Sequence, residues 1–424
     1  MKFVHVADVH LDTRYVNRDE HIRRQLREAG RTAFRRAVDL AVREDVDAFL
    51  IAGDLFDGER LSFETERLLL AEMAKLQQAG IHVVYATGNH DPGREGHRSW
   101  QLEWPSNVTV VRDHTPQEID IHRSDGALAG RVTAAGHETR ADTEDLASTF
   151  PRPQRDQPLL DGDVAHVGML HSQVVGARAT DAHERYAPAE LDTLIQSGYD
   201  YWALGHVHLR QPLSEDPPIW YPGNPQGTNP GETGAKGALL VDLSPEQEPE
   251  IRFVPLGPIC WEHLRVDGLE EATTLDDIQR RVRSIWIRER DEDPGHEGCD
   301  WILRVELVGP CPLHRQLTEA HERQTIAEAL VDDLGLLDAE IRTTRLHAPV
   351  DPAEHRERQD TLGQALRMLD QASSDPELRR RLEPDHLAGA PDNEDEYLAD
   401  LLDGLDHDLV ARMIDSGDSR GRSS

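Results

Sequence analysis

The stretch FVHVAD at residues 3–8 is an apolar run that ends in polar residues, and the chain repeats this pattern twice more. The second and third runs are DAFLIAGD (47–54) and IHVVYATGNHD (81–91). Residues 18–44, between the first two runs, carry apolar positions at close to helical spacing, and we expect a second helix at 62–79. This alternation predicts a largely parallel sheet with helices packed on it.

The pattern of expected strands and helices changes near Pro255–Pro258, which marks the end of this half of the chain. Before it, further strands are expected at 107–112, 131–136, 164–170, 200–205, 219–221, 237–242 and 250–254. After it, helices at about 272–287 and 319–334 and strands at 301–309 and near 339–345 predict a small α+β module. The acidic segment 289–300, which contains Gly and Pro, is expected to be an exposed loop.

From Pro349 the chain is charged and predicted to be helical. One face of a first tail helix carries Leu362, Leu366 and Leu369, and one face of a second carries Leu398, Leu402, Leu405 and Leu409. The acidic residues 383–396 between them are expected to be a linker. The leucine stripes would suit either docking of a partner or packing within this region.

The composition is that of a globular protein of two or three domains, with 424 residues, 38% hydrophobic and 30% charged. No apolar run approaches the ~20 residues that span a bilayer. The first strand begins at the initial Met, which leaves no room for a secretory signal. Three scattered cysteines form no CxxC pair and fit a reducing compartment. We therefore expect a cytoplasmic protein without membrane contact.

The net charge of −34 argues against nucleic-acid binding, because an acidic surface repels a polyanion. Global charge, however, does not decide what a local cleft binds. Residues 14–36 hold eight Arg against three acids, and Arg23, Arg27 and Arg31 recur every four residues on one helical face. These arginines would either track phosphates or pair with acidic neighbours.

Five short polar motifs follow predicted strands. They are DVH (8–10), GD (53–54), GNHD (88–91), MLHS (169–172) and GHVH (205–208). Open α/β sheets place ligand sites beyond the carboxyl ends of their strands. Mixed oxygen and imidazole ligands suit manganese, iron or zinc better than calcium. Each motif is weak alone, but five in this order predict a metal site, with Gly53, Gly88 and Gly205 allowing close backbone approach.

This ordered set resembles the calcineurin-like metallophosphoesterase superfamily, whose pattern is DxH, GD, GNH(D/E), H and GHxH, over roughly residues 1–255. The resemblance implies an α/β fold in which a β-sandwich is flanked by helices, followed by a small α+β capping domain and a helical tail. It also implies that one metal is held by Asp8, His10, Asp54 and His208. The other would be held by Asp54, Asn89, His171 and His206, with Asp54 bridging.

In this family-based picture, a water shared by two divalent ions becomes the nucleophile that attacks the phosphate ester. His90 is left free to act as the catalytic residue that protonates the leaving oxygen. Asp91 is a weaker candidate to orient an imidazole. We expect two Mn²⁺ ions, with Fe²⁺ or Zn²⁺ as alternatives.

Longer stretches are similar to SbcD-type DNA repair exonucleases, especially their YhaO-like bacterial branch. They are YDYWALGHVHLRQ (199–211), WYPGNPQG (220–227), TGAKGALLVDL (233–243) and GDLFD (53–57). Protein Ser/Thr phosphatases carry GDxxDRG at the second motif, whereas no Arg follows Asp57 here.

The SbcD likeness implies a metal-dependent DNA exonuclease or endonuclease. Its phosphoesterase domain would cover residues 1–257, its capping domain 258–347 and its helical tail 348–424. In such enzymes the cap shapes DNA access and the tail grips the coiled coil of an SMC-like ATPase, and a homodimer is expected. The alternatives are a stand-alone phosphodiesterase on nucleotides or other small esters, and a scaffold subunit with an unused site.

Other candidates carry weaker expectations. His5 is expected to be a packed residue rather than a ligand. His97 is close enough to GNHD to meet substrate, and Trp100 and Trp104 would either stack on a base or pack internally.

Overall fold

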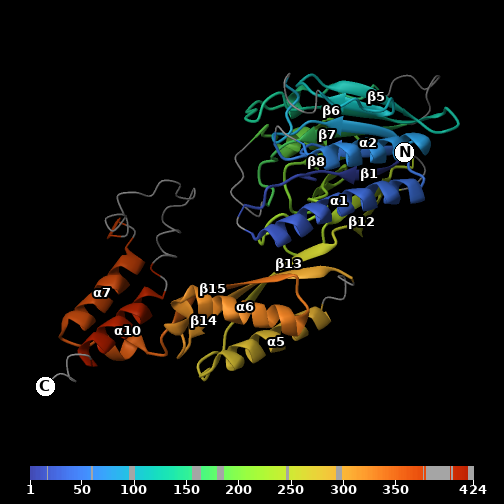
Figure 1. Ribbon diagram of the computed structural model, residues 1–424. Coiled ribbons are helices and arrows are strands. Elements are labelled where there is room, and N and C mark those ends of the chain that lie inside the picture. Colours follow the sequence, from blue (N-terminus) through green and yellow to red (C-terminus); the bar gives the residue numbers. More distant parts are fainter. Residues whose placement is uncertain are drawn as a thin grey trace. The chain divides into compact units, whose positions relative to one another are not determined.

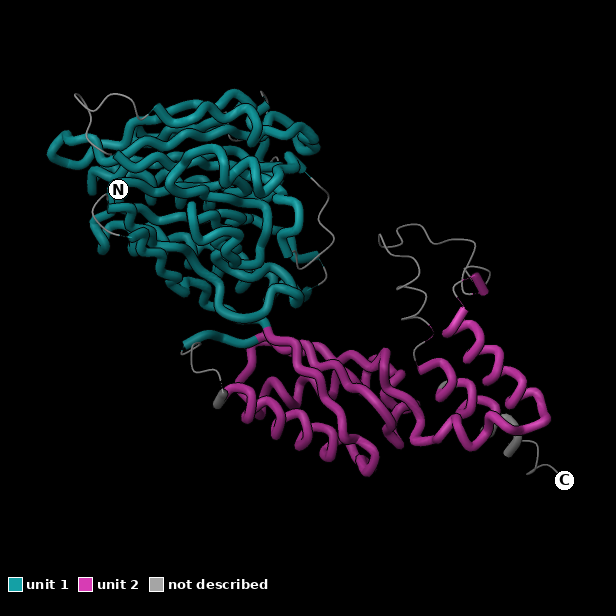
Figure 2. The backbone as a smooth tube through the Cα atoms, turned by 180° about the vertical axis from the view of Figure 1, so that it is seen from behind, with its two compact units in different colours: residues 1–261, 295–301 teal, residues 262–294, 302–424 magenta. Residues whose placement is uncertain are grey.

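The chain forms two compact units in the computed structural model (Figure 2). Unit 1 comprises Met1–Trp261 and Gly295–Trp301, and unit 2 comprises Glu262–Pro294 and Ile302–Ser424. The structure describes residues 1–16, 18–58, 61–94, 101–154, 164–178, 186–244, 248–292, 298–375, 377–378, 402 and 404–418.

The first sheet of unit 1 has six strands in the order β12-β11-β1-β2-β3-β4. Their bounds are β1 Lys2–Val6, β2 Ala48–Ala52, β3 His82–Ala86, β4 Val108–Val111, β11 Gly237–Asp242 and β12 Glu250–Pro255. Neighbours from β1 to β4 are parallel, whereas β11 pairs antiparallel with β1 and β12. The crossovers from β1 to β2 and from β2 to β3 contain α1 (Glu20–Arg43) and α2 (Phe63–Gln78). The predicted parallel core is therefore confirmed, and two antiparallel strands extend it.

The second sheet of unit 1 has the order β5-β6-β7-β8-β10-β9. Its strands are β5 Gln117–His122, β6 Leu128–Ala135, β7 Ala165–His171, β8 Tyr201–Gly205, β9 Gln211–Glu215 and β10 Pro218–Tyr221. The central strands β6, β7, β8 and β10 are parallel to one another. A short helix, α4 (Leu191–Gln196), leads into β8.

The two sheets stack on each other through the apolar side chains on their facing sides. In β1 and β2, Phe3 and Leu50 belong to the apolar layer between the sheets, while Val4 and Ile51 pack on the helical side. The helix α1 covers that side with a stripe of buried residues that includes Leu26 and Phe34. Figure 1 shows α1 and α2 beside the first sheet. Unit 1 is thus the predicted β-sandwich flanked by helices.

Unit 2 contains most of a three-stranded sheet of order β13-β14-β15, with strands at Ile259–Val266, Asp300–Pro310 and Asp338–His347. Its helices are α5 (Leu275–Glu292) and α6 (Ala320–Leu334). Two further helices follow, α7 (Thr361–Ser374) and α10 (Leu405–Asp418). The predicted α+β module and helical tail are therefore present.

The predictions failed where side chains gave no apolar signal. The strands β5 (QEIDIH) and β9 (QPLSE) were not predicted, because their exposed positions carry mostly polar or charged residues. The predicted loop at 289–300 is wrong at its start, since α5 continues to Glu292. The predicted linker 383–396 and Leu398 lie outside the described residues.

In the tail, Leu362 and Leu366 of α7 pack with Val410 of α10. Part of the predicted leucine stripe is therefore used internally. Across the described part of the chain, no helix is long and apolar enough to cross a membrane.

Candidate metal centre

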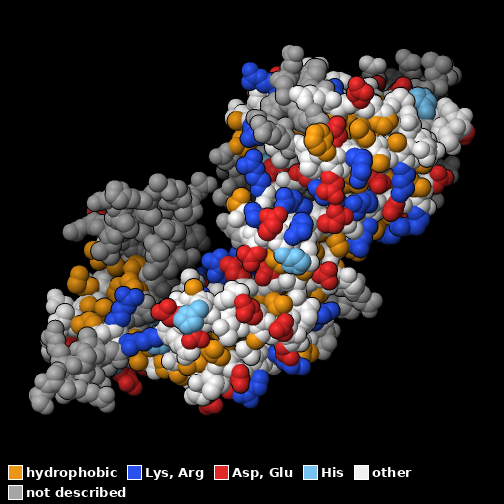
Figure 3. All heavy atoms as spheres, in the orientation of Figure 1, with side chains coloured by type: hydrophobic (Ala, Val, Ile, Leu, Met, Phe, Trp, Pro, Cys, Tyr) orange, Lys and Arg blue, Asp and Glu red, His pale blue; other side chains and the backbone are white. Residues whose placement is uncertain are grey.

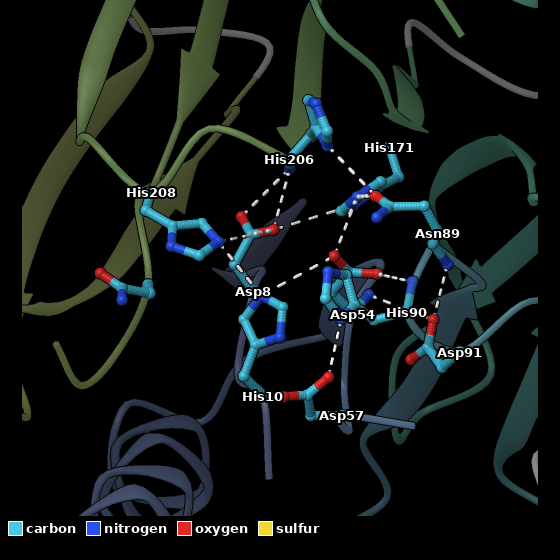
Figure 4. A network of polar contacts seen from close by, with 12 residues as sticks. Asp8, His10, Asp54, Asp57, Asn89, His90, Asp91, His171, His206 and His208 are labelled. Atoms are coloured by element: carbon cyan, nitrogen blue, oxygen red, sulfur yellow. Dashed lines mark hydrogen bonds and ion pairs between the residues drawn. The ribbon is translucent and has the colours of Figure 1, made fainter. Parts of the chain in front are cut away.

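The strand ends of both sheets bring all eight predicted site residues together (Figure 4). Asp8 and His10 follow β1, Asp54 follows β2, and Asn89 and His90 follow β3, whereas His171 ends β7 and His206 and His208 follow β8. Parallel strands point their carboxyl ends to one edge of a sheet, so side chains from distant segments converge there. Six of the eight residues are buried. The side chain of His208 is 13% exposed and that of His90 is 44% exposed, so His90 is the most accessible member of the group.

The backbone at these positions is strained. Asp8, His10 and Asp54 have φ of 52°, 47° and 50°, and His206 has φ of 102°. Residues other than Gly seldom adopt positive φ, and each such residue costs of the order of 1–3 kcal/mol. Surrounding contacts must hold four such residues in place, which is typical of functional sites.

The three motif glycines are required because a Cβ at any of them would collide with a neighbouring atom of the site or of its strands. A Cβ at Gly53, which has φ of +88°, would lie 2.2 Å from Nδ1 of His171. At Gly88 it would lie 2.3 Å from Oδ1 of Asp54. At Gly205 it would lie 1.8 Å from the carbonyl oxygen of Ala52. Any side chain at these positions would displace either a candidate ligand or the strand that carries one.

The first group of candidate ligands is Asp8, His10 and His208. Nε2 of His10 lies 3.1 Å from Nε2 of His208, and Oδ1 of Asp8 lies 3.9 Å from the same His208 atom. The other ring nitrogen of His208, Nδ1, donates to Oε1 of Glu232 over 2.6 Å. That bond fixes a proton on Nδ1 and turns Nε2 toward His10 and Asp8.

The second group surrounds Oδ1 of Asn89, which lies 2.9 Å from Nε2 of His171 and 3.2 Å from Nδ1 of His206. Nδ1 of His171 donates to the carbonyl oxygen of Ala52 over 2.9 Å. In its neutral form, the His171 ring therefore presents an unprotonated Nε2 to the amide oxygen. Two acceptors that face each other at this distance require a proton or a cation between them.

Asp54 lies between the two groups. Its Oδ2 is 3.7 Å from Nε2 of His10 and 3.3 Å from Nε2 of His171, and its Oδ1 accepts the backbone N–H of His90 over 2.8 Å. One carboxylate oxygen is therefore near both sets of imidazoles. This is the position that a bridging ligand requires.

The pKa values of the buried carboxylates and histidines show that the site requires positive charge beside its carboxylates. Burial raises the pKa of Asp8 to about 6, although His171 and His208 oppose this shift. Burial acts the same way on Asp54, but His171 and neighbouring histidines outweigh it and hold the pKa of Asp54 well below its usual range. Burial opposes protonation of His171, yet Asp54 outweighs it and raises the pKa of His171 to about 9, whereas burial lowers the pKa of His10 to about 3. The two buried carboxylates are stable together only if protons or cations lie beside them.

The donor atoms suit a divalent transition metal. Two ligands about 2.1 Å from one ion and at roughly right angles to each other are about 3.0 Å apart, and wider angles give slightly larger separations. The separations of 3.1 Å for His10 with His208, 2.9 Å for Asn89 with His171 and 3.2 Å for Asn89 with His206 match this spacing. Imidazole with carboxylate and amide oxygen is a donor set of manganese, iron and zinc sites.

His90 differs from the other histidines, because Asp57 holds it. Nδ1 of His90 donates to Oδ1 of Asp57 over 2.7 Å. Burial opposes protonation of this ring, but the bond to Asp57 and the charge of Asp54 outweigh it and raise the pKa of His90 to about 9. The ring is therefore a proton donor in this arrangement.

Two supporting carboxylates were not assigned roles from the sequence. Asp57 belongs to the quoted GDLFD motif, so its spacing from Asp54 was available as a signal. Glu232 lies in the loop between β10 and β11, and no local pattern marks it. Burial opposes ionisation of Glu232, but the bond to His208 outweighs it and lowers the pKa of Glu232 to about 2, so this carboxylate is charged.

The suggestion that Asp91 orients an imidazole is wrong. Its carboxylate accepts the backbone N–H groups of Gly88 (2.7 Å), Leu55 (2.6 Å) and Asp54 (3.3 Å) and the hydroxyl of Tyr85 (2.5 Å). Asp91 is 1% exposed, so these bonds replace its hydration. It ties the loop after β2 to the loop after β3 and thereby positions Asp54.

A cavity of about 460 Å³ opens over the centre. It is lined by His10, Thr13, Asp54, Asp57, Asn89, His90, Arg140, Tyr186, His206, His208 and Thr228. A candidate metal centre with an adjacent cavity of this size has room for one nucleotide unit or a small ester.

The arginines of α1 are engaged by acidic partners. Arg31 is only 7% exposed and forms ion pairs with Asp12 (3.1 Å) and Glu64 (2.6 Å), so it cannot track phosphates as part of an exposed stripe. Arg23 pairs with Glu20 over 2.7 Å. On the face of unit 1 that Figure 3 shows, basic and acidic side chains alternate. Of the two expectations for these arginines, the contacts favour pairing with acidic neighbours.

Two of the weaker candidates, His5 and Trp104, are packed within unit 1. Both ring nitrogens of the fully buried His5 are hydrogen-bonded, to the Tyr201 hydroxyl and to the carbonyl oxygen of Leu204. Trp104 packs edge-on against Tyr85. His97 and Trp100 lie outside the described residues.

The comparisons with known proteins agree with this geometry. The model of the calcineurin-like phosphoesterase family matches residues 1–210, and that of the middle domain of metallophosphoesterase YhaO matches 261–347. The chain is 33% identical over 316 residues to a protein of Bacillus subtilis, across 74% of this chain and 72% of that one. The chain therefore belongs to the calcineurin-like phosphoesterase family. That relative is the uncharacterized metallophosphoesterase YhaO.

Two nuclease-related proteins are more distantly similar. The DNA double-strand break repair protein Mre11 of Methanopyrus kandleri is 28% identical over 298 residues, which are 67% of this chain and 62% of that protein. The SbcD component of the nuclease SbcCD of Escherichia coli is 28% identical over 274 residues, 58% of this chain and 65% of that one. The chain thus matches less than two thirds of the length of either relative.

Glu232→Gln tests the support of His208. The neutral amide of Gln is a weaker hydrogen-bond acceptor for Nδ1–H of His208 than the charged carboxylate. Loss of such a partner behind a metal-ligating histidine typically lowers the affinity for the metal about 10–100-fold. We expect weaker Mn²⁺ binding by calorimetry with an unchanged fold by circular dichroism. Glu215→Gln, in β9, is the matched control. Unchanged affinity in Glu232→Gln would show that Glu232 does not support the site.

Proposed function

We propose that this protein is a two-metal phosphodiesterase that acts on DNA. The observation that carries the proposal is the convergence of six candidate nitrogen and oxygen ligands around a seventh, Asp54. An Asp57–His90 pair lines the cavity beside them. A pair of cations that polarises a phosphoryl group beside a separate proton donor is an arrangement for hydrolysis of phosphate esters.

The ligands divide into two sets in this proposal. Asp8, His10, Asp54 and His208 would hold one ion, and Asp54, Asn89, His171 and His206 would hold the other. Bound Mn²⁺, or alternatively Fe²⁺ or Zn²⁺, would supply an activated water and electrophilic stabilisation of the phosphoryl oxygens. The chain's own residues supply the remaining steps.

His90 is the proposed catalytic residue. Asp57 fixes the proton on Nδ1, so Nε2 is the atom that donates a proton to the leaving oxygen. The backbone N–H of His90 also donates to Asp54, which ties the proton donor to the ligand between the two groups. In this proposal the buried residues bind the metals, whereas the partly exposed His90 transfers the proton.

DNA is the proposed substrate because two relatives are named as a component of a nuclease and a DNA double-strand break repair protein. The net charge of −34 and the paired arginines of α1 favour a second candidate, a phosphodiesterase for nucleotides or other small esters. Such an enzyme needs no long basic surface. The two functions differ in whether the chain cleaves DNA as well as a chromogenic diester.

His90→Ala and Asp57→Asn test the mechanism and the substrate together. In assays on single- and double-stranded DNA with Mn²⁺, we expect wild type to cleave and His90→Ala to lose about 10²–10⁴-fold in kcat. Asp57→Asn should lose less, because the ring is kept but its proton is no longer held by a charge. Both variants should bind as much Mn²⁺ as wild type in calorimetry.

Two outcomes contradict these roles. Loss of metal from His90→Ala would make His90 a ligand rather than a proton donor. Hydrolysis of bis-p-nitrophenyl phosphate without any cleavage of DNA would replace the proposed substrate with a small ester.

The tail is proposed to bind an SMC-like coiled-coil ATPase, as expected from the SbcD resemblance. Although Leu362 and Leu366 pack internally, Met368 and Leu405 remain 57% and 42% exposed. Exposed apolar side chains on two helices that pack together provide a surface for a partner helix. Residues 258–347 are proposed as the capping domain and 348–424 as the docking region, after a phosphoesterase domain at 1–257.

Met368→Glu tests the docking surface. We expect it to weaken capture of the coiled-coil ATPase of the same organism at least about 10-fold, because a charge in an apolar interface loses its hydration. Gln364→Glu, an exposed change on the same helix, is the control. Deletion of 349–424 should abolish capture and leave hydrolysis of bis-p-nitrophenyl phosphate intact. Capture that survives the deletion would refute docking by the tail.

A homodimer and a cytoplasmic location stay predictions from the resemblance and the composition. A solution mass of twice 47.7 kDa in light scattering would confirm the dimer, and 47.7 kDa would exclude it.

A further inference from the structure

Arg140 forms part of the wall of the cavity over the candidate metal centre. Among the described residues that line this cavity, it is the one Lys or Arg. It is exposed, and within the described part of the chain it has neither a hydrogen bond nor an ion pair. This contrasts with Arg23 and Arg31 of α1, whose guanidinium groups are paired with carboxylates. Among the described residues, no carboxylate therefore neutralises the charge of Arg140 beside the cavity.

The loop that carries Arg140 is firmly anchored around Asp142. The Asp142 carboxylate accepts the backbone N–H groups of Glu138 (2.9 Å) and Thr139 (3.2 Å), the Thr139 hydroxyl, and Nε2–H of His114 (2.8 Å). Asp142 is only 6% exposed, so these bonds replace water. Two carboxylates, Glu138 and Asp142, lie two residues from Arg140 in sequence. That of Asp142 is committed to the backbone and to His114, and among the described residues Glu138 forms no ion pair with Arg140.

Two further bonds link this loop to the metal centre. Nε2 of His137 donates to the carbonyl oxygen of His171 over 2.7 Å, so the start of the loop is fixed to a candidate ligand. The carbonyl oxygen of Asp142 accepts the backbone N–H of Ala187 over 2.7 Å, next to Tyr186 of the cavity wall. Arg140 therefore projects from a loop that is held at both ends against the site, which is what a binding residue requires.

We propose that Arg140 binds a phosphate group of the substrate that neighbours the one being hydrolysed. This inference rests on the proposed function, in which the metal ligands hold the scissile phosphate. A guanidinium presents two parallel N–H donors to a phosphate and stays charged at any physiological pH. An arginine beside the centre, in a chain of net charge −34, gives local attraction for a second phosphate of the same strand. The ligand class is a nucleic-acid strand with consecutive phosphates.

The test compares substrates with one and with two phosphates. They are bis-p-nitrophenyl phosphate and unphosphorylated thymidine dinucleotide, with one phosphate each, and the same dinucleotide carrying a 5′- or a 3′-phosphate. For Arg140→Ala we expect KM to rise about 10-fold for one of the phosphorylated dinucleotides. Values for the substrates with one phosphate should stay within about twofold of wild type. Arg140→Lys should fall between, because Lys keeps the charge but lacks the paired donors.

The control variant is Arg123→Ala, which removes an exposed arginine that pairs with Asp47 beyond the opposite ends of the strands. It should leave KM for all four substrates unchanged. An equal rise in KM of Arg140→Ala for the substrates with one phosphate would overturn the proposal, since Arg140 would then act on the scissile phosphate. An unchanged KM for both phosphorylated dinucleotides would also overturn it. Wild type that hydrolyses bis-p-nitrophenyl phosphate but no dinucleotide would instead overturn DNA as the proposed substrate.

Discussion

Two carboxylates, Asp8 and Asp54, lie almost fully buried among four imidazoles at the meeting edge of two sheets. Burial of a negative charge without a partner is so costly that the charge must be neutralised where it stands. The raised pKa values of His171 and His208 favour protons at these two rings, and divalent cations would bring more positive charge.

Hydrogen bonds to the outer ring nitrogens of His171 and His208 direct the second ring nitrogen of each toward the centre. The Ala52 carbonyl accepts from His171, and Glu232 accepts from His208, so both Nε2 atoms can offer their lone pairs to a cation. Asp91 has a different task, since it satisfies backbone N–H groups of two loops at once. His90 is held by Asp57, which suits it to the proposed proton transfer. In this proposal, metal binding and proton transfer belong to different histidines, which differ in their hydrogen-bond partners.

The convergence of the candidate ligands could be predicted because their signals are local. Each buried strand is an apolar run, each motif follows a run directly, and parallel strands must bring their ends together. The roles of Glu232 and Arg140 depend on which distant segments meet, and neither residue lies in a pattern that reveals this. Asp91 was misjudged because its position beside His90 in sequence suggested an imidazole partner, whereas the turn directs its carboxylate to backbone N–H groups. The strands β5 and β9 were missed because mostly polar edge strands resemble loops in sequence.

The central claim is that Asp54 is shared by two cations. Crystals of the protein grown with Mn²⁺ would test it most directly, through anomalous scattering at the manganese edge. We predict two peaks about 3.5–4 Å apart, with Asp54 contacting both. A single peak, or two peaks that do not share Asp54, would contradict the account.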